Sequence, residues 1–241
     1  MTLSKLLTSR YSCRAFLPDQ VDEATIDTLF GLAQLTPSWC NTQPWQVYLT
    51  SGAATTAFAE ALSMHAASQP PESDLPLPGT YTGVRDERRR EAGHGLYATL
   101  GIERSDRDAR AAQMMRNFTF FDAPHTAVVT ASSELGVYGA VDCGAYVSTL
   151  LLAAQELCLG AVAQGAIAFH SGFVRSWLSI PEDEDIVCAI SFGHADPDAR
   201  VNAFRTTRAD ARDAVHRVIG QSRHEPVVTA QPARRRRAAH R

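Results

Sequence analysis

Pro37-Ser38-Trp39-Cys40-Asn41-Thr42-Gln43-Pro44-Trp45 joins turn formers, small hydroxyls, amides and indoles in one short stretch, residues 37–45. The residues before it, 22–35, place apolar side chains at the spacing of one helical face, and helices tend to end just before a proline. The residues after it, 45–50, alternate apolar and polar as a strand does. The stretch is therefore predicted to be a loop between a helix and a strand, and its side chains suit a polar and aromatic pocket better than a core.

A second cluster, Arg10-Tyr11-Ser12-Cys13-Arg14, lies near the amino terminus. Two guanidiniums and a hydroxyl form a donor set that wraps a phosphate or a carboxylate with charge-assisted hydrogen bonds. Taken alone, two arginines beside a first helix also fit a solvated face, because short basic patterns often arise by accident. The anion-binding interpretation gains weight from the loop at 37–45, which follows one helix later.

The two clusters resemble the nitroreductase family of flavin enzymes. Its members open with Arg-x-Ser-x-Arg/Lys and continue, after one amphipathic helix, with Pro-Ser-x-x-Asn-x-Gln-Pro-Trp. Here the resemblance extends to Gln164-Gly165, after a long apolar helix and an apolar strand, and to the segment from Asn202 to Arg208. It covers residues 3–219, and these matches in register are more specific together than any one of them.

The resemblance implies an α+β fold with three α/β/α layers, a mixed, mostly antiparallel central sheet and an intertwined homodimer with FMN at the subunit interface. Residues 1–220 are expected to form one domain of this kind. The helices and strands predicted from the rest of the sequence fit that class. Predicted helices cover residues 55–67, 85–100, 106–117, 138–157, 170–178 and 210–219, and predicted strands cover 126–130, 161–163 and 185–192.

The resemblance also assigns site residues at the phosphate end of FMN. Arg10 and Ser12 match this end together with Arg205 and Arg208, and a phosphate with nearly two negative charges justifies such a cluster. Tyr11, between the first two, is counted with the cofactor-binding residues. Arg14 matches the position that points at the N1 and C2 carbonyl edge of the isoalloxazine, where a cation stabilises the negative charge of reduced flavin.

The remaining assignments concern the ring of the flavin. Pro37, Ser38 and Trp39 match the segment that reaches the flavin from the partner subunit in this family. Asn41 and Gln43 either bond the pyrimidine edge of the ring or only tie down their own loop. Gln164 and Gly165 match a place close to flavin N5, which glycine lets the backbone approach. Many relatives carry glutamate where this chain has Gln164, and an amide cannot carry that charge.

Composition bounds the function. The chain has 241 residues, 45% of them hydrophobic, and a formal charge of −3. Its last residues, 222–241, carry +5 and the rest therefore −8, so the acidic body does not suit nucleic acid. We expect residues 221–241 to be a basic, disordered tail. With five widely spaced cysteines, no metal-ligand pair of histidines and no secretory signal, we expect a cytoplasmic protein without a bound metal.

Two local features have open alternatives. Phe118, Phe120 and Phe121 are expected in the core or in dimer contacts rather than stacked on a ligand. The apolar run from Val137 to Leu159 is interrupted by polar side chains, so it is expected to be a buried helix rather than a membrane span. The segment 69–121 matches the family least and is predicted to shape the mouth of the pocket.

The functional prediction is an FMN-dependent oxidoreductase. NADH or NADPH reduces the flavin and is replaced by an electron-poor acceptor, such as a nitroarene, a quinone or an activated alkene, in ping-pong fashion. No catalytic acid is assigned, because hydride transfer to N5 requires none. The first alternative is a flavoenzyme of the same fold with another task, such as reductive dehalogenation or flavin fragmentation. The second is a flavin-binding or nucleic-acid-associated protein without catalysis, with Arg234–Arg237 as its contact.

Overall fold

A computed structural model describes residues 1–218 of the chain, and a four-stranded sheet lies at its centre. The strands are β1 (Trp45–Ser51), β2 (His125–Ser132), β3 (Gly160–Gln164) and β4 (Glu184–Gly193), in the order β1-β2-β4-β3. All three pairings are antiparallel, with a bulge between Val129 and Thr130. In the described residues a parallel pairing occurs only outside the sheet, as an isolated bridge between Glu72 and His170. The sheet predicted to be mixed is thus antiparallel within residues 1–218.

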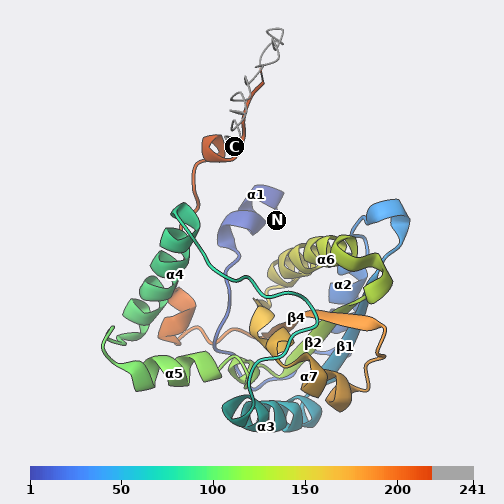
Figure 1. Ribbon diagram of the computed structural model, residues 1–241, viewed down its shortest axis with the longest axis horizontal. Coiled ribbons are helices and arrows are strands. Elements are labelled where there is room, and N and C mark those ends of the chain that lie inside the picture. Colours follow the sequence, from blue (N-terminus) through green and yellow to red (C-terminus); the bar gives the residue numbers. More distant parts are fainter. Residues whose placement is uncertain (219–241) are drawn as a thin grey trace, which may run out of the picture. The chain divides into compact units, whose positions relative to one another are not determined.

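Helices cover both faces of the sheet, as Figure 1 shows. On one face α2 (Glu23–Ala33) and α6 (Gly136–Glu156) pack on the sheet through a cluster that includes Leu29, Tyr146 and Ile190. On the other face α3 (Ala53–Ser68) and α7 (Ser171–Leu178) pack on it through a second cluster that includes Phe58 and Ile186. This order of helix, sheet and helix confirms the predicted α+β class and its three layers.

Local chemistry sets the ends of the second helix. Asp22 caps the amino end of α2, because its carboxylate accepts from the backbone N–H of Thr25 at 2.9 Å. At its other end, the predicted stop before Pro37 holds, and Gln34 is the C-cap residue. Ile26, Leu29 and Ala33 lie on the buried face of the helix, as the apolar spacing predicts.

Helix α6 is long and apolar. Among the residues that the structure describes, the segment Ser133–Glu156 is the one helical stretch with the length and composition to cross a membrane, a test that core helices of soluble proteins also pass. Here α6 lies on the sheet, with Cys143, Tyr146 and Leu150 in the core and the ring of Tyr146 stacked on that of Trp45. The packing agrees with the interpretation as a core helix.

The segment 69–121 carries two further helices, α4 (Val84–Leu100) and α5 (Arg107–Met115). The loop before α4 is fixed at two points. The Glu72 backbone N–H donates to the Phe169 carbonyl at 2.6 Å, and the Asp74 carboxylate pairs with the Arg175 guanidinium at 2.7 Å. After α5, Phe118, Phe120 and Phe121 are all buried. Those three rings are core residues, which is the first of the two alternatives.

The helix predicted over residues 210–219 is wrong within the described part of the chain. Only a short 3₁₀ turn, Ala211–Asp213, forms there, and Val215 and Val218 are exposed. A short helix gains its stability from an apolar face packed on a partner, and this segment buries none.

Contact between residues divides the chain into Met1–Thr206 and Thr207–Arg241, so the first unit ends before the predicted boundary at residue 220. The predicted disordered tail, 221–241, lies outside the described residues.

Candidate functional site

The amino-terminal cluster lies against the end of the sheet. The Cys13 backbone N–H donates to the Ala161 carbonyl of β3 at 3.1 Å, and the Leu17 N–H donates to the His194 carbonyl at 2.8 Å. The approach to β3 is close, because a Cβ on Gly160 would lie 2.8 Å from Cys13 Sγ. Glycine is therefore required at residue 160. Cys13 lies beside Ala161, which precedes Gln164 by three residues in β3.

Arg205 joins this cluster from the far end of the first unit. Its guanidinium lies 3.9 Å above the centre of the Tyr11 ring, and its Nη1 donates to the carbonyls of Asn202 at 2.7 Å and of Phe204 at 2.9 Å. A guanidinium over an aromatic face is attracted by the ring quadrupole. The structure thus places Arg205 with Tyr11, as the predicted phosphate end requires.

Arg14 is held from two sides. Its backbone N–H donates to Asn202 Oδ1 at 2.8 Å, and its own Nη1 donates to the Ser12 carbonyl at 3.2 Å. Desolvation lowers the pKa of the Arg14 guanidinium from its ordinary value, and the nearby Cys13 thiol opposes this shift. An arginine stays cationic in a protein under such a shift. Arg14 is therefore a partly desolvated cation, which acts on a nearby negative charge more strongly than one in open water.

Arg10 and Arg208 have different settings. Arg10 is the C-cap residue of α1 (Leu3–Ser9), and its backbone N–H donates to the Leu6 carbonyl at 3.0 Å. It directly precedes Tyr11 in the sequence. Arg208 belongs to the second unit, where its Nη1 donates to the Thr207 carbonyl at 2.8 Å. The assignment of both guanidiniums to a phosphate stays a prediction.

The side chain of Gln164 is buried and is held by hydrogen bonds at both its nitrogen and its oxygen. Its Nε2 donates to the Asn117 carbonyl at 2.8 Å, and its Oε1 accepts from the Ser191 hydroxyl, which also bonds the hydroxyl of Thr126. This amide holds the segment after α5 to the sheet, and the contact of Gln164 with a flavin stays a prediction. The neighbouring Gly165 is exposed, and a Cβ built there meets no atom within 4 Å. The backbone at Gly165 is thus open to a ring that approaches it.

The loop at 37–45 is a rigid turn. Cys40, Asn41 and Gln43 adopt positive φ values of 49°, 58° and 48°, and the Gln43 backbone N–H donates to Ser38 Oγ at 2.8 Å. The Gln43 side chain accepts from Gln34 Nε2 at 2.9 Å, and that residue's Oε1 in turn accepts from the Trp45 indole. Gln43 therefore ties down its own loop. Asn41 is exposed, and its side-chain amide makes no hydrogen bond to another residue of 1–218.

The loop leans on α6 and not on the arginine cluster. The Trp39 backbone N–H donates to the Asp142 carboxylate at 3.0 Å, and the Trp39 ring lies 4.8 Å from that of Tyr138. Within residues 1–218, the hydrogen bonds and ring contacts of Tyr11, Arg14 and Arg205 do not include the loop 37–45. Within one chain, Arg14 and Arg205 both bond Asn202, and Cys13 lies beside the start of β3. Gly165 follows the end of that strand, and the loop with Trp39 leans on α6.

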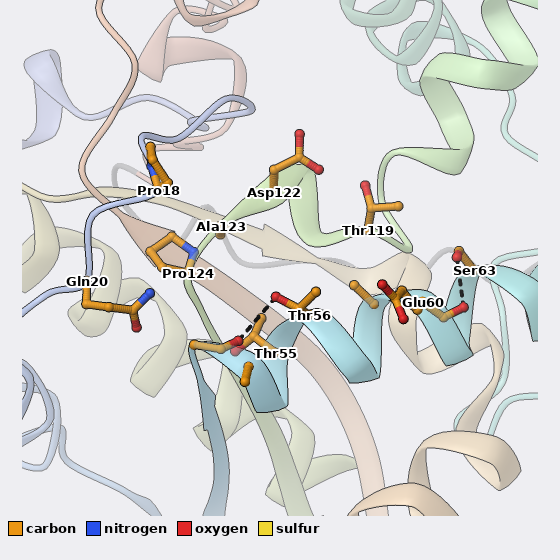
Figure 2. A pocket seen from close by; sticks show the side chains of 13 residues that line it. Pro18, Gln20, Thr55, Thr56, Glu60, Ser63, Thr119, Asp122, Ala123 and Pro124 are labelled. Atoms are coloured by element: carbon orange, nitrogen blue, oxygen red, sulfur yellow. Dashed lines mark hydrogen bonds between the residues drawn. The ribbon is translucent and has the colours of Figure 1, made fainter.

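A cavity of about 550 Å³ lies apart from these residues, between α3 and the segments 18–20 and 119–124 (Figure 2). Its hydroxyls bond within the protein, since Thr56 donates to the Gly52 carbonyl and Ser63 to the Glu60 carbonyl. Glu60 and Asp122 bring two carboxylates, and no lysine or arginine lines the cavity. An anionic cofactor such as FMN does not suit this lining.

Two structural contributors escaped the sequence analysis. Asn202 is buried and bonds both Arg14 and the carbonyl of Ala15, whereas the sequence analysis used it only as one end of a matching segment. Gly95 contacts Phe204, beside Arg205, and nothing in the helix pattern of 85–100 singles it out. A buried asparagine among apolar residues was the available signal for Asn202. Within residues 1–218, no three His, Cys, Asp or Glu side chains gather as a metal site.

Comparison with known proteins gives the chain its relatives. The profile of the Nitroreductase family matches residues 7–194. The chain is 38% identical over 206 residues to the nitroreductase NfnB of Mycolicibacterium smegmatis, a match that covers 85% of this chain and 88% of that protein. It is 32% identical over 213 residues to a 4-nitrobenzoate reductase of Pseudomonas putida, covering 88% of this chain and 93% of that protein.

Solved structures agree with these relatives. The crystal structure of the FMN-dependent nitroreductase NfnB from Mycobacterium smegmatis, in complex with NADPH, has a TM-score of 0.85 and 36% identity and covers 90% of this chain and 97% of that chain. An FMN- and NADPH-dependent NfnB from a sphigopyxis strain has a TM-score of 0.85 and 30% identity, with 91% and 100% covered. Because the family profile spans most of the first unit and these relatives match over nearly their whole length, the chain belongs to the nitroreductase family.

Proposed function

We propose that this protein is an FMN-dependent oxidoreductase that takes electrons from NADPH or NADH and reduces a nitroarene or another electron-poor acceptor. The observation that carries the proposal is the cation pair at the end of β3, where Arg205 lies over Tyr11 and Arg14 is held beside Ser12. Solved relatives bind FMN and use NADPH, and curated relatives include a 4-nitrobenzoate reductase and a nitrobenzene nitroreductase. NADPH is therefore the first reductant to test.

The residues present fit an anionic flavin. Arg205 would supply N–H donors to the phosphate, while its Nη1 is anchored on two carbonyls. Arg14 places a partly desolvated cation where the ring gains negative charge, which favours the reduced cofactor. Gly165 leaves room for the ring at the end of β3. When bound, FMN supplies a carrier that accepts hydride from the nicotinamide and passes it on to the acceptor.

We further propose a homodimer with the site completed by the partner's loop at 37–45. Leu35 and Trp39 of the loop region, with Val137, Tyr138 and Val141 of α6, are exposed in the single chain, and each leaves more than half of its surface to solvent. Large apolar side chains that gather in this way mark an interaction surface. A two-fold dimer would cover this surface and bring Ser38 and Asn41 of one subunit to the arginines of the other.

A mixing experiment tests the shared site. An Arg14→Ala variant and a Ser38→Ala/Asn41→Ala variant are each expected to lose most NADPH-dependent nitroarene reduction. After joint refolding, half of the dimers are mixed, and each mixed dimer holds one intact site, so about a quarter of the wild-type activity should return. Two inactive variants that gain nothing when mixed would show that both clusters serve the same subunit's site. Full activity of the Ser38→Ala/Asn41→Ala variant alone would remove the loop from the site.

The nature of the acceptor is tested separately. Turnover of a nitroarene with NADPH by the yellow, flavin-loaded protein is expected, with parallel lines in a double-reciprocal plot because the nicotinamide leaves before the acceptor binds. A loaded protein that oxidises NADPH but leaves nitroarenes unchanged would favour another reductive task on the same fold. The cytoplasmic location stays a prediction that fractionation of the source cells would test.

A further inference from the structure

The side chain of Asn202 bonds three backbone groups in two other parts of the chain, residues 14–15 and residue 196. It lies in η5 (Arg200–Ala203) and is 7% exposed. Its Oδ1 accepts from the Arg14 N–H at 2.8 Å, and its Nδ2 donates to the Ala15 carbonyl at 2.8 Å and to the Asp196 carbonyl at 2.9 Å. Both donors and the acceptor of this amide are used, so its orientation is fixed. The main chain at Arg14 cannot shift without breaking this network.

The backbone of Asn202 holds the second cation. Its carbonyl accepts from Arg205 Nη1 at 2.7 Å, and the carbonyl of Phe204 accepts from the same atom at 2.9 Å. One residue therefore fixes Arg14 through its side chain and Arg205 through its main chain. These two cations come from sites 191 positions apart in the sequence, and Asn202 is the group that both contact.

Helix α4 supports this arrangement from outside. A Cβ on Gly95 would lie 2.8 Å from Cε2 and 3.5 Å from Cζ of the Phe204 ring, so the ring rests on the bare backbone of the helix. Figure 1 shows η5, in orange, beside α4. At Gly93, two positions earlier in α4, a Cβ would meet no atom within 4 Å. Only one of these two glycines is thus in contact with the residue that precedes Arg205.

We propose that Asn202 and the contact between Gly95 and Phe204 position the two flavin-binding cations, Arg14 for the ring and Arg205 for the phosphate. The inference rests on the proposed function, since it needs FMN at this place. It makes Asn202 and Gly95 positioning residues that touch no part of the cofactor. The inference also means that a change in α4 alters the affinity for the phosphate. Helix α4 lies in the segment predicted to shape the acceptor pocket.

The test compares FMN with riboflavin, which has the same ring and no phosphate. Gly95→Ala pushes the Phe204 ring and moves Arg205, so the dissociation constant for FMN should rise about tenfold while that for riboflavin changes less than about twofold. Gly93→Ala is the matched control and should leave both constants unchanged. Shortening the ring in Gly95→Ala/Phe204→Leu should restore part of the FMN affinity, which general damage to α4 would not allow.

Asn202→Ala has a different expected signature. Because Arg14 and Arg205 both lose their support, FMN and riboflavin should both bind more weakly, and the potential of the bound flavin should fall. Arg205→Ala serves as the reference for a lost phosphate contact. The wild type is expected to bind FMN more tightly than riboflavin, and Arg205→Ala should lose this difference. If both hold but Gly95→Ala and Asn202→Ala bind FMN as the wild type does, the inference is wrong and the proposed function stands. A wild-type protein that binds no FMN would overturn both.

Discussion

Replacing Gln164 by glutamate tests the buried amide that joins β3 to the segment after α5. The amide donates to the Asn117 carbonyl and accepts from the Ser191 hydroxyl, and the residue is 2% exposed. Glutamate has the same shape. When protonated it can still donate one hydrogen bond and accept the other, whereas its carboxylate would face the carbonyl oxygen of Asn117 with no donor between them.

The expected loss depends on pH with a definite sign. Burial raises the pKa of a carboxyl group, and buried glutamates reach values of about 8–9, against about 4.3 in the unfolded chain. Between these two values the folded variant binds more protons than the unfolded chain, so its free energy of unfolding falls as pH rises. The slope approaches about 1.4 kcal/mol per pH unit, which amounts to roughly 3–4 kcal/mol between about pH 5 and about pH 8.

Urea unfolding followed by circular dichroism at these two pH values measures the effect, relative to the wild-type protein at each pH. The matched control is Gln164→Leu, which removes both hydrogen bonds without adding a titrating group and should lose about 1–3 kcal/mol at either pH. A Gln164→Glu protein whose loss is the same at both pH values would refute the buried, doubly bonded position of this side chain. The same variant would then reopen the possibility that residue 164 faces the flavin.

Two further predictions concern the protein away from the site. Asp74→Asn leaves the nearly buried Arg175 guanidinium without its carboxylate and should lower the free energy of unfolding by about 2–4 kcal/mol in urea unfolding, with no change in FMN affinity; an unchanged unfolding curve would contradict this role of the ion pair. Burial raises the pKa of Cys143 and of Cys188 to about 12, so neither thiol should react with a disulfide reagent at about pH 8 until the protein unfolds, whereas the exposed Cys158 should react at once. Mass spectrometry of the labelled peptides separates these thiols, and early labelling at Cys143 would show that α6 is not packed as described.

Much of the fold could be predicted from the sequence because its elements have strong local signals. The helix ending before Pro37, the strand from Trp45 and the long apolar helix all form where periodicity and breakers indicate. The helix expected over residues 210–219 fails for the opposite reason, since its pattern had no partner to bury against. A pattern predicts an element only when the rest of the chain supplies a surface for it.

The site divides in the same way. The resemblance to nitroreductases implies that Arg14 and Arg205 serve one ligand, and the structure brings both to Asn202. Spacing could not reveal that Gln164 turns its amide into the core, because the outcome depends on the partners Ser191 and Asn117 from distant segments. The contact of Gly95 with Phe204 is equally invisible in the sequence, since two elements meet there that share no local pattern.

The position of Asn202 has a consequence for how flavin binding and folding depend on each other. The cations at the two ends of the first unit face one ligand only after β3 and β4 have paired and η5 has docked on the segment 10–17. Arg14 and Arg205 both bond Asn202, and an anion bound by both guanidiniums would offset the repulsion between the two cations. FMN at the proposed site would bind groups that only the folded chain assembles, so flavin is expected to stabilise the fold by mass action. Because Arg205 is fixed through Asn202 and Phe204, and the Phe204 ring rests on Gly95, we expect this stabilisation to reach α4.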